Sequence, residues 1–217
     1  MHVQAVLFDG FDPLDLIGPL EILYAGGVAT GGAITVELVS AEGARDVPSA
    51  LEMISLKATA RLDPERADLI VVPGAAGATE QGDPGDDSIP SRLRRALGTE
   101  LPGLLGAALA REGVTVATVC GGSLLLAMAG LVEGRPAAGH HQTLPGMADL
   151  GVRAVGARVV DDGDLVSGAG VTSGLDLGLH LLEREFGPRV AHTVERLFAY
   201  ERRGVVWRET GAEAVAV

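Results

Sequence analysis

The stretch that decides the fold is residues 114–129, VTVATVCGGSLLLAMA, because it joins a short β-branched run directly to an apolar helical run. Residues 114–119 have the composition of a strand that is buried on both faces of a parallel sheet. Residues 120–122, Cys-Gly-Gly, form the connection, and residues 123–129 have the composition of a helix. A strand that turns so abruptly into a helix predicts a βα unit with its connection at the carboxyl edge of a sheet.

The same alternation of short β-branched runs and longer helical stretches continues along the rest of the chain. The expected strands are residues 3–8, 34–40, 53–56, 68–73, 114–119, 152–160 and 165–167. The expected helices are residues 14–23, 88–112 with an interruption at Pro102, 123–129, 175–186 and 189–203. Strands and helices in alternation predict an α/β sandwich, with a mostly parallel sheet and helices on both faces.

Length and charge limit the class of protein further. A chain of 217 residues with 47% hydrophobic residues can build one sizeable core. Because the sequence shows no internal repeat and no linker, we expect a single domain over residues 1–205 and a C-terminal tail over residues 206–217. A formal net charge of −12 disfavours nucleic acid and anionic membranes as partners. Without a leader pattern or a long apolar run, we expect a soluble, cytoplasmic protein.

Cys120 is the only cysteine in the chain, which excludes an internal disulfide and a cysteine-rich zinc site. Its place between a buried strand and two glycines is the arrangement of a nucleophile elbow. A helix N-terminus behind the sulfur would lower the thiol pKa. Backbone N–H groups of Gly121 and of the Gly74–Ala75 turn could then form an oxyanion hole. The alternative is that Cys120 is a small hydrophobic residue at the end of a core strand.

A thiolate needs a group that handles protons, and Asp15 is the best candidate. It lies within an apolar helical stretch that would pack on the sheet, where burial raises the pKa of a carboxyl. Asp12 precedes Pro13 at the expected helix start and is interpreted as the N-cap, while Glu21 is interpreted as a solvated helix residue.

Other chemistries have little support in the sequence. The histidines His140 and His141 follow an extended segment and lie within reach of the same edge of the sheet. No spacing of His, Cys, Asp or Glu is typical of a metal site. The turn at residues 73–77 lacks both the P-loop and the dinucleotide fingerprint, so we expect no metal and no nucleotide cofactor.

These residues, taken together, resemble the DJ-1/PfpI superfamily. The resemblance covers residues 3 to about 200, and its most specific parts are residues 14–21, 71–74, 118–123, 131–140 and 168–176. It implies a flavodoxin-like three-layer sandwich with a cysteine nucleophile elbow. Within the superfamily, the chain is most similar to the isonitrile hydratase branch, whose members add water to an isocyanide and release an N-substituted formamide.

The resemblance implies a role for each candidate residue. Cys120 would attack the isocyanide carbon, and Asp15 would act as the general acid and base. Backbone groups of Gly121, Gly74 and Ala75 would line the pocket. His140, Ile17 and Val171 would complete it. The superfamily also implies a homodimer and a small-molecule substrate.

Two positions depart from the pattern of the branch. Gly121 stands where the branch usually has Thr, and Ala75 replaces the second Gly of the usual Pro-Gly-Gly. Two alternatives therefore stay open beside the hydratase. One is a glyoxalase or deglycase that uses the same thiolate and carboxylate. The other is a non-catalytic small-molecule or redox sensor of the same fold.

Overall fold

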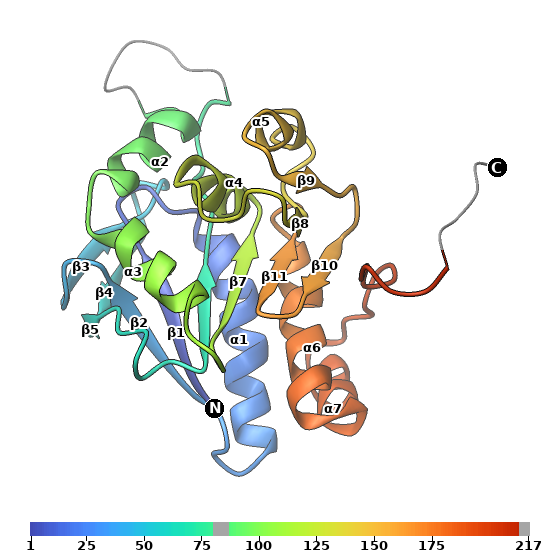
Figure 1. Ribbon diagram of the computed structural model, residues 1–217. Coiled ribbons are helices and arrows are strands. Elements are labelled where there is room, and N and C mark those ends of the chain that lie inside the picture. The colour runs from blue at the N-terminus through green and yellow to red at the C-terminus, as the bar shows by residue number, and fades with distance from the viewer. Residues whose placement is uncertain (80–86, 213–217) are drawn as a thin grey trace.

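A seven-stranded sheet forms the centre of the computed structural model, which describes residues 1–79 and 87–212. In this sheet every pair of neighbouring strands is parallel except β10 and β11. In spatial order the strands are β10 (Val159–Asp162), β11 (Leu165–Gly168), β7 (Thr115–Val119), β6 (Leu69–Val72), β1 (His2–Leu7), β2 (Thr35–Ser40) and β5 (Ala60–Arg61). Figure 1 shows these strands running through the middle of the molecule.

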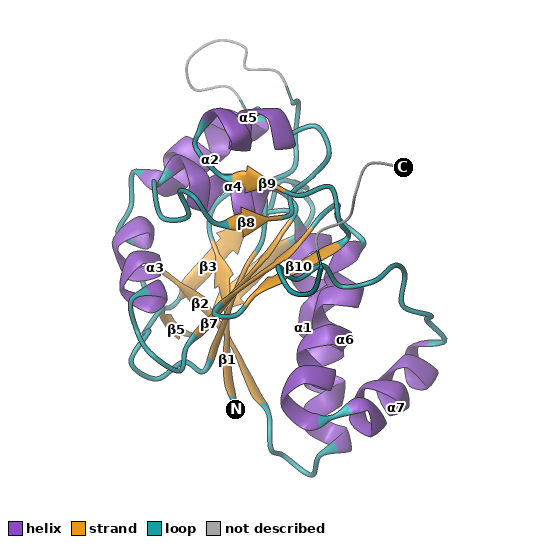
Figure 2. Cartoon of the chain, turned by 45° about the vertical axis from the view of Figure 1, so that its right-hand side comes forward, coloured by secondary structure: helices purple, strands orange, loops and turns teal. Residues whose placement is uncertain are grey.

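Helices cover both faces of this sheet (Figure 2). One layer is formed by α1 (Pro13–Ala29), α6 (Ser173–Phe186) and α7 (Pro188–Phe198), and the other by α2 (Ile89–Leu97), α3 (Leu101–Leu109) and α4 (Gly121–Met128). The short helix α5 (Leu144–Asp149) packs against α4. This arrangement confirms the expected flavodoxin-like α/β sandwich with its mostly parallel sheet.

The peripheral elements differ from the expectations. Residues 152–160 were expected to form one strand, but they split into β9 (Arg153–Ala154) and β10, because β9 pairs with β8 (Pro136–Ala137) outside the main sheet. The strand β4 (Ser55–Ala58) pairs with β3 (Arg45–Pro48) as a separate hairpin. The last helix ends at Phe198 rather than at residue 203, since Ala199 adopts a left-handed conformation with φ 47°.

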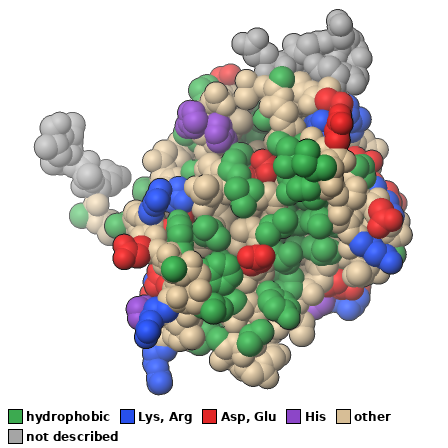
Figure 3. Space-filling view, turned by 180° about the vertical axis from the view of Figure 1, so that it is seen from behind, with side chains coloured by type: hydrophobic (Ala, Val, Ile, Leu, Met, Phe, Trp, Pro, Cys, Tyr) green, Lys and Arg blue, Asp and Glu red, His purple; other side chains and the backbone are tan. Residues whose placement is uncertain are grey.

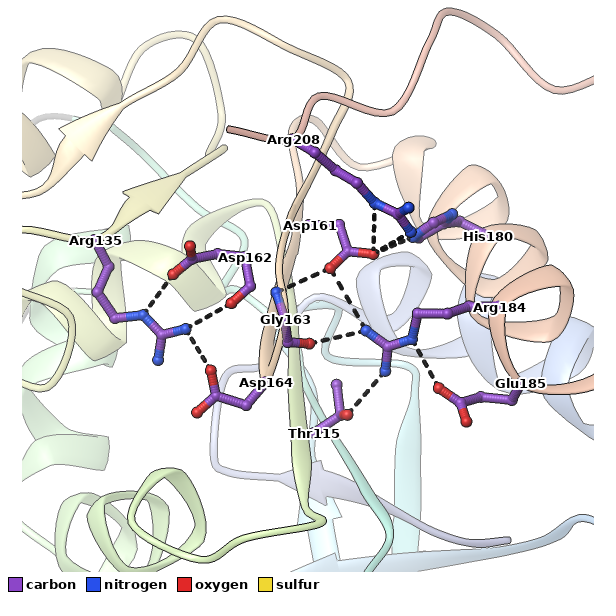
Figure 4. Close-up of polar contacts among 10 residues, drawn as sticks. All are labelled: Thr115, Arg135, Asp161, Asp162, Gly163, Asp164, His180, Arg184, Glu185 and Arg208. Carbon is purple, nitrogen blue, oxygen red and sulfur yellow. Dashed lines mark hydrogen bonds and ion pairs between the residues drawn. The ribbon is translucent and has the colours of Figure 1, made fainter. Parts of the chain in front are cut away.

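The segment after α7 lies along the outer edge of β10. The N–H of Asp161 donates to the carbonyl of Trp207 at 2.9 Å, and the Arg208 guanidinium binds the Asp161 carboxylate at 2.8 Å. Figure 4 shows His180 and Arg184 reaching the same carboxylate from α6. Residues 213–217 of the expected tail lie outside the described residues. None of the described helices combines the length and apolar composition that a membrane-spanning segment requires.

Candidate active site

The carboxyl ends of β6 and β7 and the start of α1 meet around one cavity of about 280 Å³. Two hydrogen bonds join the end of β6 to the start of α1. The N–H of Asp12 donates to the carbonyl of Gly74 at 2.9 Å, and the N–H of Gly74 donates to Asp15 Oδ2 at 3.0 Å. The described residues that line the cavity are Asp12, Ala75, Ala76, Gly77, Thr79, Ile89, Pro90, Cys120, Gly121, Leu124, His140, Gln142, Thr143 and Val171.

Cys120 has a strained backbone, with φ 56° and ψ −116°. A positive φ costs a residue with a side chain about 1–3 kcal/mol, and such strain gathers at functional sites. The turn is held because the N–H of Cys120 donates to the carbonyl of Gly168 at 3.0 Å. It directs the thiol out of the line of β7 and into the cavity, where Cys120 is 8% exposed. This geometry is the one that a nucleophile elbow requires.

Two glycines let the backbone segments approach each other closely at this turn. A Cβ on Gly74 would lie 2.5 Å from the Gly121 nitrogen and 2.8 Å from Asp15 Oδ2. A Cβ on Gly122 would lie 2.3 Å from the carbonyl oxygen of Val72. These distances are too short for any side chain, so the approach of β6 to the start of α4 depends on glycine at both positions.

Asp15 has no solvent exposure, because it lies on the buried side of α1. The helix begins where the sequence predicts it: the Asp12 carboxylate accepts the Leu14 N–H at 3.0 Å, and Pro13 follows as the first helical residue. Oδ1 of Asp15 has no well-formed hydrogen bond within the described residues. The side chain that interacts with the carboxyl group is Cys120.

Burial and charge govern the proton affinity of this pair. Burial is the main cause that raises the pKa of Asp15 to about 8, and the charge of Asp12 adds to it. Burial also raises the pKa of the Cys120 thiol, and the Asp15 carboxylate raises it further. The hydrogen bond from the Gly121 N–H acts in the opposite direction without outweighing these effects. The expectation of a lowered thiol pKa is therefore wrong, chiefly because the thiol is buried.

The structure brings most of the predicted site residues together. Ala75, Gly121, His140 and Val171 line the cavity with Cys120, and Asp15 and Gly74 lie immediately behind them. Ile17 is half-buried on α1 and is not among the described lining residues.

Several lining residues have no signal in the sequence that identifies them. Leu124 belongs to an apolar helix, and Ile89 and Pro90 begin α2, so periodicity alone assigns them to the core. Thr143 and Gln142 follow His140 in the loop before α5. Asp12 is the N-cap that the sequence predicts, yet it also faces the cavity.

The ring of His140 packs against that of His141 in a tilted arrangement, with ring centroids 4.2 Å apart and an interplanar angle of 39°. Partial burial and the neighbouring His141 both lower the pKa of His140, so at neutral pH the imidazole is uncharged. No group of three His, Cys, Asp or Glu side chains in the described part of the chain could hold a metal ion.

Comparison with known proteins identifies the family to which this chain belongs. The model of the DJ-1/PfpI family matches residues 1–184, and the chain belongs to that family. It is 32% identical over 203 residues to the isonitrile hydratase of Pseudomonas putida, a match that covers 92% of this chain and 78% of that protein.

Two solved structures show the same fold. A ThiJ/PfpI family protein from Pseudomonas syringae has a TM-score of 0.75 at 24% identity, with 94% of this chain and 76% of that one covered. Drosophila melanogaster DJ-1beta has a TM-score of 0.73 at 18% identity, with 92% of this chain and 98% of that one covered.

Proposed function

We propose that the protein hydrates a small isocyanide to an N-substituted formamide, with Cys120 as the nucleophile and Asp15 as the general acid and base. The observation that carries the proposal is the Cys120 thiol, which a strained turn directs into a cavity beside a buried carboxyl. The likeness to isonitrile hydratase over 92% of the chain supports the choice of substrate.

The reaction balances without a co-reactant. The sulfur of Cys120 attacks the terminal carbon of R–N≡C, and that carbon takes up a proton, which gives the thioimidate R–N=CH–S. Water then adds across the C=N bond, with its oxygen going to the carbon and a proton to the nitrogen. The C–S bond breaks as the hydroxyl becomes a carbonyl, the hydroxyl proton returns to the pair of Cys120 and Asp15, and R–NH–CHO leaves. Cys120 thus splits the addition of water into two easier steps.

Asp15 is suited to both proton transfers because its pKa of about 8 lies near neutral pH. While Asp15 is protonated, it no longer opposes ionisation of the thiol by charge, and it can give its proton to the bound isocyanide carbon. Once it is ionised, the same carboxylate can take a proton from the attacking water. The two groups titrate as a coupled pair, so the reactive form holds one proton between them.

Incubation with cyclohexyl isocyanide tests the proposal, with formation of the formamide as the readout. We expect Cys120→Ala to abolish turnover and Asp15→Asn to lower kcat by about a hundredfold or more, since acid–base catalysis contributes on that order. Gly103→Ala, in α3 away from the cavity, serves as the control and keeps full activity.

Two outcomes would contradict the hydratase. Consumption of methylglyoxal without formamide formation would favour a glyoxalase. Ready oxidation of Cys120 without turnover of either substrate would favour a redox sensor.

We also propose that the protein forms a homodimer through the outer face of α1. Leu14, Tyr24 and Val28 share that face and are 49%, 66% and 70% exposed. Figure 3 shows hydrophobic side chains gathered on the side of the molecule where α1 and α6 lie. Exposed apolar patches of this kind mark interaction surfaces, and the homodimer that the family resemblance implies would cover this one with a second copy.

A further inference from the structure

Among the described residues that line it, the cavity around Cys120 carries one formally charged side chain. Of the described residues that line it, Asp12 is the only Asp, Glu, Lys or Arg. His140 is the other ionisable group besides the thiol, and its lowered pKa keeps it uncharged at neutral pH. Residues 80–86, which follow Thr79 in the chain, contain no Lys or Arg in their sequence.

The charge of Asp12 is fixed in place and acts on the reacting groups. Its carboxylate accepts the Leu14 N–H at 3.0 Å, and its backbone N–H donates to Gly74 at 2.9 Å. The same charge is among the causes that raise the pKa of both Asp15 and Cys120, after burial in each case.

No salt bridge within the described residues neutralises Asp12. The guanidinium of Arg92, on α2, forms its salt bridge with Asp87 and is not among the lining residues. The apolar part of the lining is formed by Ile89, Pro90, Leu124 and Val171, and its other side chains, such as Thr79, Gln142 and Thr143, carry no positive charge. An anion that enters the cavity would therefore lose its hydration and meet a negative charge without a cation to compensate it.

We propose that Asp12 is a specificity-determining residue that disfavours anionic substrates, so that Cys120 reacts with small apolar molecules that are neutral or cationic and carry no carboxylate or phosphate. This inference rests on the proposed function in one respect, namely that Cys120 is the reacting group. It adds the charge class of the substrate and the residue that selects it.

Two alkylating agents of nearly equal size provide a test that does not require turnover. Iodoacetamide is neutral and iodoacetate is anionic, and both react with the same Cys120 thiolate. The ratio of their rate constants is therefore independent of the thiol pKa. We express the ratio as the rate constant for iodoacetamide over that for iodoacetate and divide it by the same ratio for 2-mercaptoethanol. This normalised ratio should be about fivefold or more at low ionic strength, and it should decrease in 0.5 M salt.

The variant Asp12→Asn removes the charge and keeps a good N-cap, and Asp12→Ser provides a second neutral cap. Both should lower the ratio to that of 2-mercaptoethanol. Glu112→Gln removes one exposed carboxylate before the opposite end of β7 and should leave the ratio unchanged. A native ratio equal to that of 2-mercaptoethanol, or one that Asp12→Asn and Asp12→Ser leave unchanged, would overturn the role of Asp12.

Turnover gives a separate readout. If the protein is a hydratase, kcat/KM for cyclohexyl isocyanide should exceed that for isocyanoacetate, and Asp12→Asn should narrow the difference. Absence of turnover with both isocyanides would contradict the proposed function, whereas the alkylation ratio alone decides the role of Asp12.

Discussion

At Asp15, burial raises the carboxyl pKa from its ordinary value of 3.8 to about 8. Between these two pH values the unfolded chain has lost this proton while the folded chain retains it, so the free energy of unfolding decreases as pH rises from about 4 to about 8. We expect Asp15→Asn to be more stable than the native protein at pH 8, by several kcal/mol, and the difference to shrink toward pH 4.

Urea unfolding at several pH values between 4 and 8 measures this effect. Glu112→Gln, which removes an exposed carboxylate far from the cavity, is the control. A pH-independent difference for Asp15→Asn would contradict the raised pKa. The reactive carboxyl would then owe its chemistry to position alone.

Gly74 is a position where packing and chemistry depend on the absence of a side chain. A Cβ there would collide with the Gly121 nitrogen and Asp15 Oδ2, so we expect Gly74→Ala to lower the free energy of unfolding by about 1–3 kcal/mol. It should also abolish turnover, because the carboxyl and the thiol would be pushed apart. Gly103→Ala is the matched control: no atom lies within 4 Å of its Cβ position, and alanine in a helix should add about 0.5–1 kcal/mol of stability. Equal effects of the two substitutions in thermal unfolding would rule out the steric argument.

At the level of elements, ion pairs of the buried Asp161 connect the edge strand β10 to α6 and to the segment after α7 (Figure 4). Burial alone would raise the pKa of Asp161, but hydrogen bonds from His180, Gly163 and Arg208 and the charge of Arg184 outweigh it and hold the pKa well below its ordinary value. Removal of one partner from a buried ion cluster leaves the other charges uncompensated.

We expect Asp161→Asn to lower the free energy of unfolding by about 3 kcal/mol at pH 7. Because the folded pKa is depressed, the native protein begins to lose this contribution as pH falls below about 4, so the difference in stability between the two proteins should narrow there. Chemical unfolding at pH 7 and pH 3 measures both effects. The exposed Asp149→Asn is the control. A variant as stable as the native protein at pH 7 would show that Trp207 and the backbone bonds suffice to hold this edge.

The elements that the sequence predicts well are those whose pattern reflects burial in the main sheet. β6 and β7 are apolar on both faces, and α1 carries its own cap and proline, so their positions follow from local signals. The sequence predicts one strand over 152–160 because Val152, Val155, Val159 and Val160 recur through that stretch. The separation of β9 from β10 depends on pairing with β8 and β11, which are tertiary partners that no local pattern encodes.

For the whole molecule, the outer face of α1 makes the oligomeric state testable. Tyr24→Asp with Val28→Asp places charges in the proposed interface, and light scattering should then report a single chain of 22.2 kDa, where the native protein gives twice that mass. Leu197→Asp, at an exposed apolar position on α7, should remain dimeric. A native protein that is monomeric at micromolar concentration would contradict the proposal.

The candidate site was partly predictable from the sequence. Cys120 and Asp15 have unusual contexts, a turn flanked by glycines and a carboxyl within an apolar helix, and the structure places them together. The direction of the thiol pKa was not predictable, because it depends on how deeply both groups are buried. The sequence did not predict the proposed role of Asp12 in substrate selection for a related reason. An N-cap is recognised from the residues of its own helix, whereas a cavity wall depends on residues that are distant in the sequence.

The hydrogen bond from Gly74 to Asp15 joins residues that are 59 positions apart in the chain. It can form only after β1 and β6 pair, and closure of so long a loop is a slow, non-local step of folding. Until then Asp15 is an ordinary solvated acid and Cys120 an ordinary thiol. A nascent or partly folded chain therefore lacks the reactive pair of Cys120 and Asp15, which forms only when the sheet is complete.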